Sequence, residues 1–185
     1  MSRTESTMLA LGSPAPDFEL TDVVSGKVVR RDDFRGHKAL LVMFICAHCP
    51  YVKHIESALG RLGADYAQKP LGIVAISSND IVAYPQDGPE GMKQQAESFG
   101  FRFPYLLDET QEIAKAYQAA CTPDFFLFDD KFELVYRGQF DSSRPRTDIP
   151  VTGEDLRAAL DAVLAGAPIL TDQRASLGCN IKWKA

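Results

Sequence analysis

The chain has 185 residues, of which 45% are apolar, 24% charged and 10% aromatic, and its formal net charge is −5. A chain of this length and composition is expected to bury one core and to fold as one domain. Because 25 acidic residues face only 20 Lys and Arg, there is no excess of positive charge to neutralise phosphates. This balance argues against a nucleic-acid partner and against an anionic membrane surface.

No apolar run approaches the roughly 18–20 residues that a membrane span requires. The short run Met8–Leu11 is also too small for the hydrophobic region of a signal peptide. We therefore expect a cytoplasmic protein. Cytosolic thiols are kept reduced, so a close pair of the four cysteines is expected to be catalytic, redox-sensing or metal-binding rather than a structural disulfide.

The first half of the chain predicts a hairpin followed by a β-α-β unit. Short alternating segments end at Leu20 and begin again at Lys27, which indicates an N-terminal hairpin. The continuous apolar run Ala39–Ile45 is typical of a strand buried on both faces. After Pro50, apolar residues recur at three- and four-residue spacing and predict a helix that ends before Pro70.

A second buried strand is predicted over Leu71–Ser77, and the order strand, helix, strand implies a right-handed crossover with parallel pairing. The remaining predicted elements are a helix between Pro89 and Gly100, a strand over Phe103–Leu107, a helix opened by a capping box of Asp108 and Gln111, a hairpin of Phe125–Phe128 with Glu133–Arg137, and a helix capped by Thr152 with Asp155 and ended by Gly166.

These elements predict an α/β fold: a mixed central β-sheet with helices on both faces. Residues 1–11 are expected to form an N-terminal extension, 12–167 the domain, and 168–185 an irregular C-terminal tail packed on that domain.

The strongest chemical signal is Cys46-Ala47-His48-Cys49-Pro50, at the junction between the buried strand and the amphipathic helix. Two cysteines at this spacing can close a small disulfide ring. The unpaired N–H groups at a helix N-terminus stabilise negative charge, so we expect a lowered pKa at Cys46. Cys46 is then the attacking thiolate and Cys49 the resolving thiol, and a protonated His48 stabilises the thiolate further.

These residues resemble the thioredoxin-like superfamily, and within it the redoxin group related to alkyl hydroperoxide reductase and thiol-specific antioxidant proteins. The resemblance rests on the opening Gly12-x-x-Ala15-Pro16-x-Phe18-x-Leu20, on the strand into Cys46-x-x-Cys49-Pro50, and on Thr122-Pro123. Within this group, the chain resembles a bacterial branch marked by the Cys-x-His-Cys-Pro motif and by the tail Gly178-Cys179-Asn180-Ile181-Lys182-Trp183-Lys184.

The resemblance implies a thioredoxin-like fold and a thiol-disulfide oxidoreductase that needs neither an organic cofactor nor a metal. It also implies a cis-proline at Pro123 facing the dithiol, with the backbone of Thr122 pairing with substrate. The expected partners are a protein thiol or disulfide and an electron donor, and the expected state is a monomer or homodimer. The acidic residues that relatives keep near the dithiol fall on Leu40 and Val52. The proton acceptor for the buried thiol is therefore His48, His54 or water.

Two alternatives remain open. Peroxiredoxins carry Thr-x-x-Cys-Pro at this junction, so Cys49-Pro50 also fits a peroxidase with Cys49 as the peroxide-reactive residue, although Cys46 takes the Thr position. A metal site, with copper as the ion, could instead draw on Cys46, His48, Cys49 and His54.

The other two cysteines carry weaker signals. Cys121 lies two residues before Pro123 and is expected near the dithiol, either as a small buried apolar residue or as a third redox thiol. Cys179 in the tail could pair with another chain or with Cys121, and a free thiol is the favoured reading.

Overall fold

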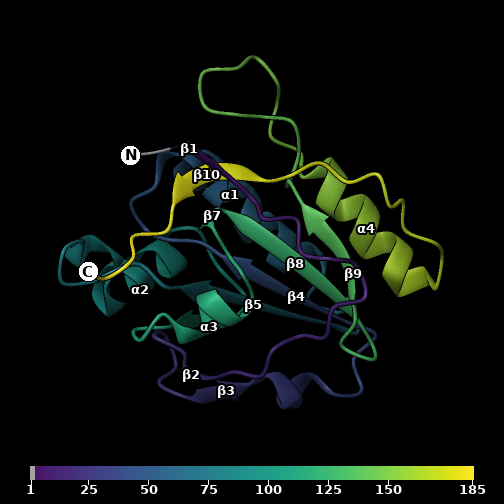
Figure 1. Cartoon of the computed structure of the whole chain (residues 1–185), viewed down its shortest axis with the longest axis horizontal. Helices are drawn as coiled ribbons and strands as arrows, with labels where there is room; N and C mark the ends of the chain where they lie inside the picture. Colours follow the sequence, from purple (N-terminus) through teal and green to yellow (C-terminus); the bar gives the residue numbers. More distant parts are fainter. Residues whose placement is uncertain (1–2) are drawn as a thin grey trace.

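The computed structural model describes residues 3–185. Its centre is a five-stranded sheet in the order β6-β5-β4-β8-β9 (Figure 1). The strands and helices of this domain are β2 (Glu19–Thr21), β3 (Val28–Arg30), β4 (Ala39–Phe44), α1 (Pro50–Asp65), β5 (Leu71–Ser77), α2 (Pro89–Ser98), β6 (Tyr105–Leu107), α3 (Glu112–Ala116), β8 (Asp124–Asp129), β9 (Leu134–Gly138) and α4 (Glu154–Ala165).

The central strand β4 pairs in parallel with β5 and antiparallel with β8. The predicted crossover through α1 is thus confirmed. So are the hairpin of β2 with β3 and the hairpin of β8 with β9. All six residues of β4 are buried, as expected for a strand whose two faces are both covered.

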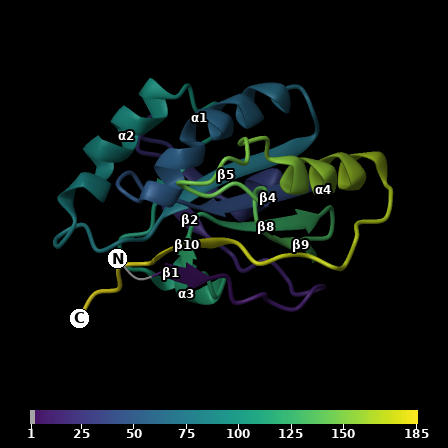
Figure 2. The ribbon, with the colours of Figure 1, turned by 90° about the horizontal axis from the view of Figure 1, so that it is seen from above.

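Alternate side chains of β4 enter two separate cores. Leu41 and Met43 pack with apolar residues of α1, α2 and α4. Leu40 and Val42 pack on the other face, with Ala114 of α3 and with the segment that precedes β2. Figure 2 shows α1, α2 and α4 on one side of the sheet and α3 on the opposite side. The predicted mixed sheet covered on both faces is therefore confirmed.

The C-terminal tail contains a strand, where an irregular segment was expected. β10 (Leu177–Asn180) lies between β1 (Arg3–Glu5) and the two-residue strand β7 (Cys121–Thr122), antiparallel to both. Figure 1 shows β1 and β10 side by side across the top of the domain. The tail has no alternating pattern because only a few of its residues pair. The N-terminal extension and the tail therefore join in one small sheet.

Two helices begin later than their predicted capping residues. α3 has Gln111 as its N-cap, with a left-handed φ of 68°. The carboxylate of Asp108 still accepts the N–H groups of Ile113 and Ala114, at 3.3 and 2.9 Å. In the same way, α4 has Gly153 as its N-cap in place of Thr152.

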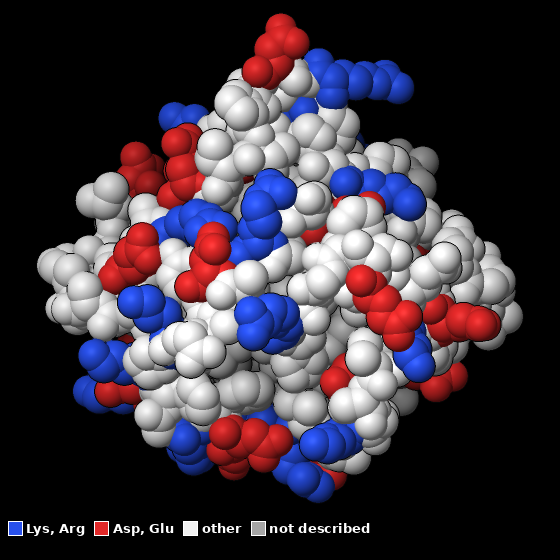
Figure 3. All heavy atoms as spheres, turned by 180° about the vertical axis from the view of Figure 1, so that it is seen from behind, with Lys and Arg blue, Asp and Glu red and all other residues white. Residues whose placement is uncertain are grey.

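Charged side chains of both signs are interspersed over the face drawn in Figure 3, which agrees with the near balance of acidic and basic residues. Within the residues described, no helix combines the length and apolar character that a membrane crossing needs.

Candidate active site

The two cysteines of the motif lie where β4 gives way to α1. β4 ends at Phe44 and α1 begins at Pro50, which suits the first helical position because its missing N–H would have no partner there. Cys49 is therefore the N-cap residue of α1. Cys46 lies earlier, in the connecting loop. The helix N-terminus that the sequence analysis assigned to Cys46 thus belongs to Cys49.

Thr122 lies against both sulfur atoms of the motif. Its Oγ1 is 3.5 Å from Cys46 Sγ, and its carbonyl oxygen is 3.4 Å from Cys49 Sγ. The Thr122–Pro123 peptide bond is cis, as predicted. Both cysteines are free thiols, so the structure is that of the reduced protein, and their exposed fractions are 1% and 0%.

Cys179 joins these two thiols from the tail. In the pairing of β10 with β7, Cys179 stands opposite Thr122. Its thiol is hydrogen-bonded to Cys49, and both residues belong to the same buried cluster as Cys46. Cys179 is indeed a free thiol, but it is buried and contacts the motif. The sequence offered no signal for this contact.

Of these three thiols, Cys49 is the one whose pKa is lowered. Thiol hydrogen bonds from Cys179 and then from Cys46 lower the pKa of Cys49, and the N–H of Val52 adds to this effect against the cost of burial. The hydrogen bond to Cys49 raises the pKa of Cys46, as do burial and the nearby charge of Asp87. The lowered pKa that the sequence analysis expected at Cys46 thus falls on Cys49, the N-cap residue of α1.

The loop between the cysteines is fixed by Asp87, a fully buried residue at the end of the loop that leads to α2. Its Oδ1 accepts the N–H groups of Ala47 and His48, at 2.9 and 3.1 Å. Its Oδ2 accepts the side-chain amide of Asn79 at 2.9 Å and also contacts His48 Nδ1. Asp87 was not singled out from the sequence.

His48 is held by Asp87 rather than by a sulfur. Its ring stacks on Tyr84, with the centroids 5.2 Å apart and the planes 9° from parallel. One ring nitrogen of His48, one carboxylate oxygen of Asp87 and Cys46 Sγ all lie within 4.8 Å of one another. The Nε2 atom of His48 is buried and has no hydrogen-bond partner within the described part of the chain. The His48 ring therefore lies beside Cys46.

A buried acid, Glu56, is linked to the backbone of Cys46 through Gln95. The amide of Gln95 donates to the carbonyl of Cys46 at 3.2 Å and to Glu56 at 2.9 Å, and Tyr105 donates to Gln95 at 2.8 Å. Glu56 and Gln95 also line a surface cavity of about 390 Å³. This network positions the backbone of the site and borders on solvent.

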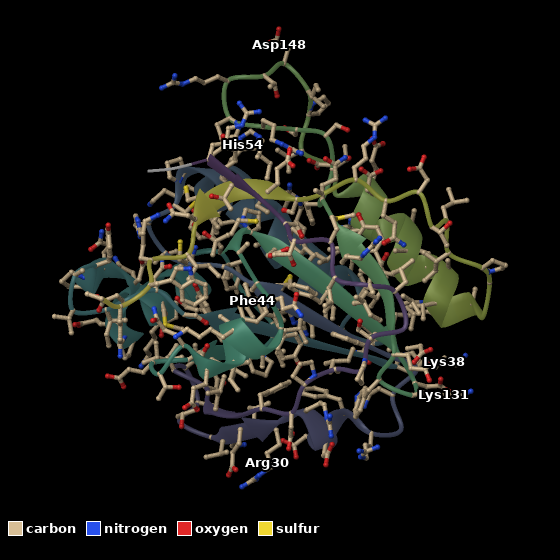
Figure 4. All side chains as sticks on the ribbon, viewed as in Figure 1. Arg30, Lys38, Phe44, His54, Lys131 and Asp148 are labelled. Carbon is tan, nitrogen blue, oxygen red and sulfur yellow. The ribbon has the colours of Figure 1, made fainter. Side chains whose placement is uncertain are left out.

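His54 is hydrogen-bonded outside the motif. Its Nε2 is 2.7 Å from the hydroxyl of Ser143, in the loop that Asp148 marks at the edge of the molecule (Figure 4). Of the four predicted metal ligands, Cys46 and His48 belong to one group of three possible ligands, and its third member is Asp87. Both oxygens of Asp87 are already engaged by donors. Among the described residues, no three of the four predicted ligands lie close enough together to share one ion.

Cys121 is buried and close to the site without sharing its hydrogen bonds. Its thiol donates to the carbonyl of Pro123 at 3.6 Å. Burial first, and then the charge of neighbouring Asp124, raise the pKa of Cys121. These surroundings favour the reading of Cys121 as a small buried apolar residue.

β10 occupies the edge of Thr122 that the resemblance assigns to substrate. Gly178 lies so close to this edge that an added Cβ would be 2.0 Å from the carbonyl oxygen of Thr122. A peptide could pair with Thr122 as predicted only after β10 has left. The reduced site is therefore closed by the protein's own tail.

The chain is similar to known proteins in sequence and in fold. Thiol-disulfide oxidoreductase ResA of Geobacillus thermodenitrificans is 32% identical over 86% of this chain and 82% of its own length. The crystal structure of an uncharacterised conserved protein from Geobacillus kaustophilus is 56% identical, with a TM-score of 0.97 over 100% of this chain and 97% of that one.

A thioredoxin domain from a thiol-disulfide oxidoreductase of Bacteroides vulgatus shares the fold, with a TM-score of 0.59 and 23% identity over 74% of this chain and 90% of that domain. The model of the AhpC/TSA family matches residues 11–137, which include the dithiol, the cis-proline and the central sheet. The chain belongs to the AhpC/TSA family and has a thioredoxin-like fold.

Proposed function

We propose that this protein is a thiol-disulfide oxidoreductase that exchanges disulfides with protein substrates through Cys46 and Cys49. The observation that supports this most directly is the contact of both sulfurs with Thr122, beside a cis-proline and at the start of α1. The ResA relative bears the name of this activity. The proposed reaction needs no organic cofactor, because the electrons move between sulfur atoms.

The reaction begins with the Cys49 thiolate. Cys49 attacks one sulfur of a substrate disulfide, and the other substrate sulfur leaves as a thiolate and takes a proton. Cys46 then loses its proton and attacks Cys49 Sγ, so that the second substrate thiolate leaves. The products are a reduced substrate and a Cys46–Cys49 disulfide, which a thiol donor reduces again. This order reverses the roles expected from the sequence, because the pKa of Cys49 is the lowered one.

His48 is the proposed acceptor for the Cys46 proton. The acidic positions of relatives are Leu40 and Val52 here, so they cannot serve. His48 has a free Nε2, and the carboxylate of Asp87 on Nδ1 orients the ring. A carboxylate that holds one imidazole nitrogen leaves the other free to accept a proton.

Insulin reduction by a dithiol donor tests the proposal. Cys49→Ser should abolish turnover because it removes the attacking sulfur, and Cys46→Ser should remove most of it. Cys121→Ser is the matched control, a buried cysteine outside the hydrogen bonds of the site, and should retain activity. Full activity in both Cys46→Ser and Cys49→Ser would refute the dithiol mechanism.

Peroxide reduction is the second candidate. Cys49 is the cysteine with the lowered pKa, it is followed by Pro50, and the AhpC/TSA family model covers it. Attack of the thiolate on hydrogen peroxide would give a Cys49 sulfenic acid and water, and Cys46 would then close the disulfide. Peroxide consumption that depends on Cys49 and exceeds insulin reduction would favour this activity. If the unmodified protein consumed peroxide no faster than Cys49→Ser does, this activity would be excluded.

A further inference from the structure

The tail strand β10 places a third thiol in the dithiol site. Cys179 is in register with Thr122, and Asn180 with Cys121. The close approach of the two strands depends on Gly178, which leaves no room for a Cβ against the Thr122 carbonyl. β1 pairs with the other edge of β10 and holds it in place. The position of Cys179 is therefore fixed by the pairing of β10 with β1 and β7.

The sulfurs of Cys179 and Cys49 meet at the N-terminus of α1. Cys49 Sγ is 3.4 Å from the carbonyl oxygen of Thr122, and Cys179 is paired with the same Thr122 across the strands. The interaction between the two thiols lowers the pKa of Cys49 and raises that of Cys179. On its other side, Cys49 receives the hydrogen bond from Cys46. Cys49 is therefore the central member of three thiols, with Cys46 and Cys179 as two separate neighbours. All three are at most 4% exposed.

We propose that Cys179 is a redox-active thiol that exchanges with Cys49, so that the oxidised protein holds either a Cys46–Cys49 or a Cys49–Cys179 disulfide. Starting from Cys46–Cys49, Cys179 loses its proton and attacks Cys49 Sγ. The Cys49–Cys179 bond forms, the Cys46–Cys49 bond breaks, and Cys46 leaves as a thiolate that takes up a proton. No electrons are gained or lost, and no further reactant is needed.

This proposal rests on the proposed function, since substrate oxidation of the dithiol supplies the first disulfide. Its consequence is a second way to resolve a substrate bound to Cys49. Cys179 can release that substrate when Cys46 does not, and it does so from the strand that lies on Thr122. The Cys49–Cys179 disulfide also ties the tail to the domain, whereas the Cys46–Cys49 disulfide leaves β10 free to move.

The test is to oxidise the Cys46→Ser variant with glutathione disulfide and to map its disulfides after trypsin digestion. The sequence gives three distinct tryptic fragments: residues 39–53 with Cys46 and Cys49, residues 116–131 with Cys121, and residues 175–182 with Cys179. We expect fragment 39–53 to be joined to fragment 175–182 in this variant, and a minor share of the same linkage in the partly oxidised unmodified protein. The unmodified protein thus gives a second readout if a variant folds poorly.

Two double variants serve as a matched pair. Cys46→Ser with Cys121→Ser should keep the linkage, and Cys46→Ser with Cys179→Ser should lose it together with the residual insulin reduction of Cys46→Ser. A linkage of Cys49 to Cys121, a linkage between chains, or no disulfide at all in Cys46→Ser would overturn the proposal.

The single variant Cys179→Ser separates this proposal from the proposed function. It keeps Cys46 and Cys49, so glutathione disulfide should still close a disulfide within fragment 39–53. If this disulfide forms but Cys46→Ser forms none, only the role of Cys179 is wrong. If Cys179→Ser forms no disulfide and reduces no insulin, the dithiol mechanism itself fails.

Discussion

Cys179 stands directly opposite Thr122 in the pairing of β10 with β7, so the tail of the chain lies on the residue that adjoins both sulfurs of the dithiol. The edge proposed for substrate is therefore covered in the reduced protein. We therefore expect a substrate to reach the sulfurs of Cys46 and Cys49 only when β10 separates from β7.

Gly178→Ala should loosen β10. The added Cβ would lie 2.0 Å from the Thr122 carbonyl oxygen, and overpacking of this kind costs about 1–3 kcal/mol. Because about 1.4 kcal/mol is a tenfold change, local opening should become roughly ten to a hundred times more frequent. We expect a matching rise in the rate at which Ellman's reagent modifies the thiols. Lys184→Ala, in the exposed end of the same tail, is the control, and equal rates in both variants would show that β10 does not limit access.

The low-pKa thiol should be Cys49. Titration of the thiolate absorbance at 240 nm should show an ionisation below the usual thiol range, which disappears in Cys49→Ser. In Cys46→Ser and in Cys179→Ser it should persist but move to higher pH, since each variant replaces a thiol that donates to the Cys49 sulfur with a hydroxyl of different size and reach. An ionisation that survives in Cys49→Ser and vanishes in Cys46→Ser would restore the order expected from the sequence.

His48→Ala should slow the step in which Cys46 resolves the mixed disulfide, by about a hundredfold if His48 is the general base. The loss should shrink as the pH rises towards the ionisation of Cys46, because a thiolate needs no base. Stopped-flow measurement of single-turnover insulin reduction across pH detects this change in profile. His54→Ala should leave the rate unaltered, since His54 contacts Ser143 instead of the dithiol. A uniform loss at every pH would point to a purely structural role for His48.

Asp124 should give the protein a pH-dependent stability. Burial raises the pKa of Asp124 to about 7 from an ordinary value of 3.8, against the hydrogen bonds that it accepts from Ala120 and Ser6. When the pKa of a carboxyl group is higher in the folded than in the unfolded protein, the group does not lower the free energy of unfolding at pH values below its unfolded-state pKa. It lowers the free energy of unfolding progressively as the pH rises from about 4 to about 7. The free energy of unfolding should fall across this window by about 4 kcal/mol, at ~1.36 kcal/mol per pKa unit.

Urea denaturation at several pH values checks this prediction. Asp124→Asn should flatten the fall between pH 4 and pH 7, whatever its effect on stability at any one pH. Asp130→Asn, at an exposed turn position, should keep the slope of the unmodified protein. An unchanged slope in Asp124→Asn would assign the pH dependence to another group.

Much of the fold follows from local patterns in the sequence. β5 is formed by the predicted residues Leu71–Ser77, and β4 and α1 match their predicted segments closely, because a buried strand and an amphipathic helix each have their own apolar period. The tail strand β10 was missed because its stability comes from pairing with β1 and β7, which no local period records.

The sequence by itself determined that two cysteines lie between a buried strand and a helix, and that Thr122-Pro123 faces them. The spacing of residues along the chain carries the first fact, and the resemblance to a known family implies the second. Only the tertiary structure decided where the negative charge resides, what holds the loop and what covers the sulfurs. Asp87 is 39 residues from His48, and Cys179 reaches Cys49 only through the pairing of the last strand. A pKa depends on such neighbours in space, and here they lower the pKa of Cys49, at the N-terminus of α1, and raise that of Cys46.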